Sequence, residues 1–246
     1  RMLTGNCESQ QHVVPKTKEF NPAIPQVWKT VGDEIIFCVR LTCMEHLALC
    51  YNAFVKSLSE YGEALRVVQP ELDVKGCAWI AVFPAPNVTV SSASKMLRES
   101  LSTTVNSQNG EAQELQADEM PGDFDFLGKN IDTGFRISKF AQAHQMALSV
   151  ELAWLLTAAR HHQLISAEFV YHGREPLKGV INNQPYPVVT VETERDHVKR
   201  RLQELERAIG VGQVANHTAP GDYLLEFMRS HAIDIPIVPL FGADIA

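Results

Sequence analysis

A tight turn at Gly32-Asp33 constrains the possible folds of this chain more than any other feature. Apolar residues run on both sides of it, over residues 27–31 and 35–40. Glycine tolerates the positive φ that such a turn requires, so the pattern predicts an antiparallel β-hairpin. Helical segments follow this hairpin, and further strands are interleaved with them. The expected class is therefore α+β.

The remaining apolar patterns predict a mixture of helices and strands, with no internal repeat. Residues 85–121 are rich in Ser, Asn, Gln and Glu and read as a surface insertion, helical near 94–102 and mobile around 106–119. Residues 233–240 are expected to be extended. Helical spacing covers residues 44–65, 132–144, 151–162, 192–209 and 221–231. Strand-like runs cover residues 77–83, 146–150, 168–172 and 186–192.

Composition excludes several classes of function. The chain has 246 residues and a formal net charge of -7, which argues against a protein that coats nucleic acid. Its five cysteines form no Cys-x-x-Cys pair, a pattern typical of free thiols in a reducing cytoplasm. No apolar run approaches the ~20 residues that a membrane span needs. We therefore expect a cytoplasmic protein that binds neither nucleic acid nor membrane.

Three short motifs contain the residues best suited to catalysis or ligand binding. Asp33 follows Gly32 at the hairpin turn, where a carboxylate suits a hard divalent cation. Asp132 and Arg136 are four residues apart and share one face of a predicted helix. Lys178 lies in a loop between two predicted strands. Taken singly, each has an ordinary interpretation: a plain turn, a surface ion pair and a solvated lysine.

Taken together and in this order, the motifs resemble the catalytic domain of class III nucleotidyl cyclases. The Lys-x-x-Gly-Asp hairpin of that family matches residues 29–33, and its Asp-x-x-Gly-x-x-x-Asn-x-x-x-Arg element matches residues 125–136 in spacing. Its late Lys-Gly matches Lys178-Gly179. The resemblance covers roughly residues 27–192. It implies a ferredoxin-like core sheet with flanking helices in a domain spanning residues 1–192, followed by a helical extension over 193–246.

The resemblance also implies roles for individual residues. Lys29 and Asp125 would read the edge of the base, and Lys178 would contact the triphosphate. Arg136 would stabilise charge that develops on the transferring phosphate. Asp132 stands where the family usually has an asparagine that orients the ribose; a carboxylate still accepts a hydrogen bond from a hydroxyl but donates none.

A further implication is a site for two Mn²⁺ or Mg²⁺ ions, with Asp33 as one carboxylate ligand. The family's first metal carboxylate lies on an opening strand of Phe-x-Asp-Ile type that precedes the hairpin. Residues 1–28 contain no such strand. We therefore expect that the chain lacks its natural beginning, which leaves one metal carboxylate where two are needed.

Two sequence features disagree on which nucleobase the substrate carries. Adenine-using members of the family carry the Lys29 and Asp125 pair. The form of residues 131–136 and the compact single chain resemble the bacterial pyrimidine cyclases of the Pycsar anti-phage system, which make cyclic UMP or cyclic CMP for an effector. We favour UTP or CTP, with ATP as the alternative. A non-catalytic cyclase-like module for nucleotide binding or dimerisation is the other alternative.

The family's active sites form between two subunits, so a homodimer is implied, with residues 186–192 at its interface.

Overall fold

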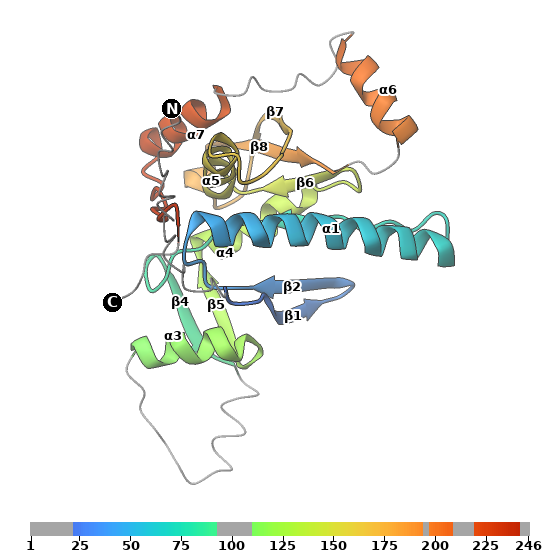
Figure 1. Cartoon of the computed structure of the whole chain (residues 1–246). Coiled ribbons are helices and arrows are strands. Elements are labelled where there is room, and N and C mark those ends of the chain that lie inside the picture. Colours follow the sequence, from blue (N-terminus) through green and yellow to red (C-terminus); the bar gives the residue numbers. More distant parts are fainter. Residues whose placement is uncertain (1–21, 93–109, 194–196, 209–218, 242–246) are drawn as a thin grey trace, which may run out of the picture.

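The computed structural model describes residues 22–92, 110–193, 197–208 and 219–241 (Figure 1). The strands are β1 (Gln26–Val31), β2 (Glu34–Cys38), β3 (Cys77–Ala78), β4 (Asn87–Ser91), β5 (Phe124–Gly128), β6 (Gln145–Leu148), β7 (Phe169–Pro176) and β8 (Pro185–Glu192). The α-helices are α1 (Met44–Val68), α3 (Gly110–Glu119), α4 (Lys129–Ile137), α5 (Val150–His161), α6 (His197–Ala208) and α7 (Ala219–Ser230).

A mixed four-stranded sheet is the largest of the sheets described. Its strand order is β3-β6-β8-β7, with β3 and β6 parallel and the other pairs antiparallel. The β1–β2 hairpin and the β4–β5 pair form two separate two-stranded sheets. Helices pack beside these sheets, so the predicted α+β class is confirmed. Among the described residues, no helix is long and apolar enough to cross a membrane.

The main hydrophobic core lies between the four-stranded sheet and the helices α1, α5 and α7. Helix α5 is apolar on most of its surface, which suits a helix covered on several sides. Its first turn is fixed by Tyr186 of β8, whose hydroxyl accepts a hydrogen bond of 2.8 Å from the backbone N–H of Val150. The core residues of α5 are Val150, Leu152, Ala153, Leu155, Leu156 and Ala159.

The segment after β8 contributes to the same core. Leu224, Phe227 and Met228 of α7 are buried in it. The following residues then run to the start of α1, where Pro239 and Leu240 accept hydrogen bonds from the backbone N–H groups of Met44 and Glu45. These donors have no partner within a helix, so the C-terminal segment closes the start of α1.

Part of the predicted surface insertion belongs to ordered structure, which corrects the expectation for residues 85–121. β4 pairs with β5 in antiparallel register, from Asn87 opposite Gly128 to Ser91 opposite Phe124. Helix α3 lies where we expected mobile chain. It is held by polar contacts: Gln113 donates to the Thr89 carbonyl at 3.0 Å, and Asp118 pairs with Arg40 at 2.6 Å. The helix predicted at 94–102 lies outside the described residues.

Several boundaries also differ from those predicted. Strand β3 is much shorter than the run at 77–83, and α4 starts three residues earlier and ends well before 144. Helix α6 begins after 192, because β8 continues to that residue. The expectation that residues 186–192 form a dimer interface is wrong: β8 is an inner strand paired on both edges, and its side chains are mostly buried.

Candidate functional site

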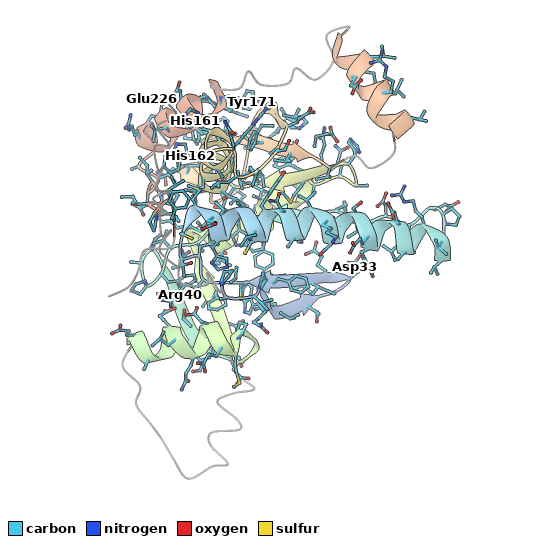
Figure 2. All side chains as sticks on the ribbon, in the orientation of Figure 1. Asp33, Arg40, His161, His162, Tyr171 and Glu226 are labelled. Atoms are coloured by element: carbon cyan, nitrogen blue, oxygen red, sulfur yellow. The ribbon has the colours of Figure 1, made fainter. Side chains whose placement is uncertain are left out.

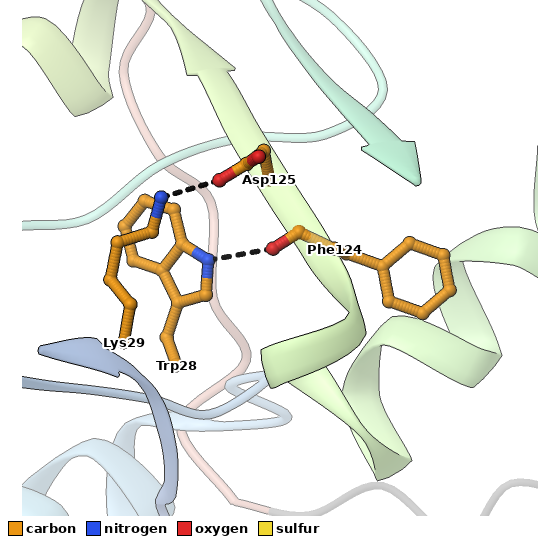
Figure 3. A network of polar contacts seen from close by, with 4 residues as sticks. All are labelled: Trp28, Lys29, Phe124 and Asp125. Atoms are coloured by element: carbon orange, nitrogen blue, oxygen red, sulfur yellow. Dashed lines mark hydrogen bonds and ion pairs between the residues drawn. The ribbon is translucent and has the colours of Figure 1, made fainter. Parts of the chain in front are cut away.

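Lys29 and Asp125 form an ion pair between the hairpin and β5 (Figure 3). The two residues are 96 positions apart in the sequence. About a third of the Lys29 side chain and two fifths of the Asp125 side chain remain exposed, at 34% and 41%. Both side chains are therefore partly exposed to solvent.

Trp28 fixes the hairpin against β5 from beneath this pair. It is only 5% exposed, and its Nε1 donates a hydrogen bond of 2.9 Å to the carbonyl of Phe124 (Figure 3). Its ring packs against Phe126 and Phe135, at centroid distances of 5.0 and 6.3 Å. The Lys29 ammonium lies 4.2 Å from the centre of the Trp28 ring, a cation–π contact. These contacts hold the backbone of Lys29 at a set place beside Asp125.

Helix α4 brings Asp132 and Arg136 to one exposed face. Its opposite face is pressed against Trp79, since a Cβ at Gly134 would overlap the indole ring. At the other end of the helix the Arg136 guanidinium approaches the loop after β7: a Cβ built on Gly179 would stand 3.9 Å from Nη2. The structure thus brings Arg136 close to the loop that contains Gly179.

The start of α4 is held by two asparagines. Asn130 donates its backbone N–H to Asn87 Oδ1 at 3.1 Å, and Asn87 Nδ2 donates to Asn130 Oδ1 at 2.7 Å. Asn87 is fully buried, and its Nδ2 also donates to the Val82 carbonyl at 2.8 Å. On the side of α5, Asn130 Nδ2 donates to Glu151 Oε1 at 3.0 Å. A polar network therefore ties β4, α4 and α5 together.

Sequence reasoning missed this network. Asn87 lay in the segment taken for an insertion, and Asn130 lay between two motif positions. Glu151 had a visible signal, because it is an acidic residue inside the apolar run of residues 150–156. A buried carboxyl in such a run needs hydrogen-bond partners, and Glu151 was recognisable on that ground.

Asp33 lies at the β1–β2 turn, where Gly32 has φ of +62° (Figure 2). Among the described residues, no group of three or more His, Cys, Asp or Glu side chains is arranged to hold a metal ion. A hard divalent ion takes six or more oxygen ligands, several of which are commonly water or substrate. Asp33 therefore belongs to no such group within the part of the chain that the structure describes.

The described cysteines are free thiols, as the sequence predicts. Burial raises the pKa of Cys77 to about 12 and that of Cys38 to about 11. Both thiols therefore stay protonated at neutral pH, which makes them poor nucleophiles.

Comparisons with protein-family models, with curated proteins and with solved structures found no match to this chain.

Proposed function

We propose that this chain is a nucleotidyl cyclase domain of the class III kind, which converts a nucleoside triphosphate to a 3′,5′-cyclic nucleotide and pyrophosphate. The proposal depends most on one observation, the ion pair between Lys29 and Asp125. These residues come from motifs that the resemblance assigns to reading the base. Their convergence from positions 96 residues apart supports that assignment.

The pair has the chemistry needed to recognise a base edge. An ammonium donates hydrogen bonds and a carboxylate accepts them, so together they select a donor–acceptor pattern.

We propose UTP or CTP as the substrate, because of the form of residues 131–136, and a second-messenger role in anti-phage defence through a downstream effector. ATP is the alternative, since adenine-using relatives in this family carry the same pair.

The second part of the proposal concerns the phosphates. The 3′-oxygen attacks the α-phosphorus in line, the bond to the β-phosphate oxygen breaks, and pyrophosphate leaves while the 3′-hydroxyl proton passes to solvent. Arg136 would stabilise the charge that builds on the α-phosphate, and Lys178 would bind the departing phosphates. Asp132, one helical turn before Arg136, would accept a hydrogen bond from the ribose.

A homodimer is part of the proposal. On the hairpin, four apolar side chains are each about half exposed: Val27 at 49%, Val31 at 46%, Ile35 at 58% and Phe37 at 50%. Covering such side chains is favourable by about 25 cal/mol per Å² of apolar surface. The hairpin is therefore the surface that we expect a second copy to cover, in place of the inner strand β8.

Turnover of the full chain tests the proposal directly. We expect pyrophosphate release from at least one of UTP, CTP, ATP and GTP in the presence of Mn²⁺ or Mg²⁺, with a product whose mass is that of the cyclic monophosphate. The product's mass also identifies the base. Binding of a triphosphate with no release of pyrophosphate would instead support the non-catalytic nucleotide-binding module.

Lys29→Ala is expected to raise KM by about 10- to 100-fold and to change kcat much less. A contact to the base stabilises the bound substrate and the transition state alike, so its loss appears in KM. A charged hydrogen bond is worth about 1.5–3 kcal/mol, which sets the size of the effect. Steady-state kinetics with the preferred triphosphate measure both constants.

Lys56→Ala is the matched control, because Lys56 is an exposed lysine that pairs only loosely, at 3.7 Å, with Glu60 on α1. Its KM should equal that of the unaltered chain. If Lys29→Ala lowers kcat at constant KM, the residue acts in the chemical step and its assignment to the base is wrong.

A further inference from the structure

Glu151 has a buried carboxyl that the reaction scheme does not use. It is the second residue of α5 and is only 5% exposed. Oε1 accepts the hydrogen bond from Asn130, whereas Oε2 has no hydrogen-bond partner within the described part of the chain. Burying a carboxyl with one oxygen unpartnered is unfavourable. Because burying its carboxyl is unfavourable, Glu151 is a candidate for a role beyond packing.

The contact partner of Glu151 lies in the first turn of α4. Asn130 is the second residue of that helix, and its backbone N–H is one of the donors that a helix start leaves without an internal partner. Asn87 accepts that N–H from the side of β4, and Glu151 accepts the Asn130 side chain from the side of α5. The helix start is thus held from two directions by buried groups.

Because α4 is short, fixing its first turn also fixes the position of Arg136. The helix has only nine residues, and Arg136 lies six residues after Asn130. A rotation or shift at the start of so short a helix moves the Arg136 guanidinium relative to the loop at Gly179. We propose that Glu151 is a positioning residue: through Asn130 it sets the orientation of α4 and so the place of Arg136. For catalysis, this inference rests on the proposed function.

A glutamine is expected to replace Glu151 well. Burial raises the pKa of the Glu151 carboxyl, while the hydrogen bond from Asn130 acts in the opposite direction. Glutamine has the same shape and keeps an oxygen that accepts from Asn130 Nδ2. Leucine has a similar volume and offers no acceptor. The two substitutions therefore separate the hydrogen bond from the packing.

The experiment compares Glu151→Gln and Glu151→Leu in the full chain. We expect Glu151→Gln to keep kcat within about threefold of the unaltered chain, and Glu151→Leu to lower kcat by about tenfold or more at nearly constant KM, because misplaced catalytic groups slow the chemical step. Hydrogen exchange is measured in parallel. The amides in the first turn of α4 should exchange faster in Glu151→Leu and stay protected in Glu151→Gln.

Two further variants keep the test decisive. Asn130→Ala removes the same hydrogen bond together with the one from Asn87 Nδ2. It should therefore lower kcat at least as much as Glu151→Leu, and it keeps the test open if that variant fails to fold. Ala159→Gly destabilises α5 by about 1 kcal/mol at a distance from α4, and should leave kcat and the α4 amides unchanged. Equal exchange and kcat in all variants would overturn the inference. If the unaltered chain turns over no triphosphate, the proposed function fails, and the exchange data still decide whether Glu151 orients α4.

Discussion

Replacing Arg136 with alanine is expected to lower turnover by about 10²–10³-fold, the usual effect of removing one group that stabilises developing charge. The guanidinium lies beside the Lys178-Gly179 loop, where the proposal puts the phosphates. The loss should appear in kcat and in kcat/KM together, because the interaction strengthens as charge develops. Arg136 is exposed, so the free energy of unfolding should change little.

Lys139→Ala is the matched control for this variant. Lys139 is also exposed and cationic, lies three residues further along the chain, and contacts the ring of Phe140 at 4.8 Å from its centre. Its removal should leave kcat unaltered. Steady-state kinetics and urea unfolding of both variants separate a catalytic effect from a structural one. Arg136→Ala with the activity of Lys139→Ala would show that Arg136 takes no part in the reaction.

Replacing Gly128 with alanine is expected to lower the free energy of unfolding by about 3 kcal/mol or more, from backbone strain and overpacking combined. Gly128 has φ of +142°, which side-chain-bearing residues rarely adopt. A Cβ there would stand 2.8 Å from the Asn87 Cα and 2.9 Å from the Pro86 carbonyl oxygen. Both neighbours are backbone atoms, so neither can rotate away. Urea unfolding followed by circular dichroism measures the loss.

Gly173→Ala separates the two contributions. Gly173 has φ of +89°, but a Cβ there meets nothing within 4 Å, so this variant carries the backbone strain without the overlap. It should lose about 1 kcal/mol, the low end of the range for such strain. Equal losses in the two variants would mean that the close approach of β4 to Gly128 contributes nothing to stability.

The sequence was most informative where one local rule decided the structure. The Gly32-Asp33 turn between two apolar runs predicted the hairpin, and helical spacing predicted α1 and α5 within a few residues. Motif spacing also singled out Lys29 and Asp125, which the structure pairs across 96 residues. The fixed order of the motifs, rather than any property of one residue, made that possible.

Prediction failed where polar contacts determine the structure. Helix α3 has few apolar residues and is held by contacts such as those of Gln113 and Asp118, which leave no periodic trace in the sequence. Strand β4 lies in the segment predicted to be a surface insertion, and it depends on pairing with β5, which is distant in sequence. The burial of Asn87 and Glu151 likewise depends on partners distant in sequence, which no local pattern identifies.

The contact between Trp28 and Lys29 has a practical consequence for spectroscopy. An ammonium 4.2 Å from the ring centre perturbs the electrons of the indole, so the emission of Trp28 responds to any ligand that draws Lys29 away. The chain has three tryptophans, and Trp154 lies in α5, away from the ion pair. A Trp154→Phe background would leave emission from the aromatic cluster around the site. Nucleotide binding could then be titrated by fluorescence without a label, and independently of turnover.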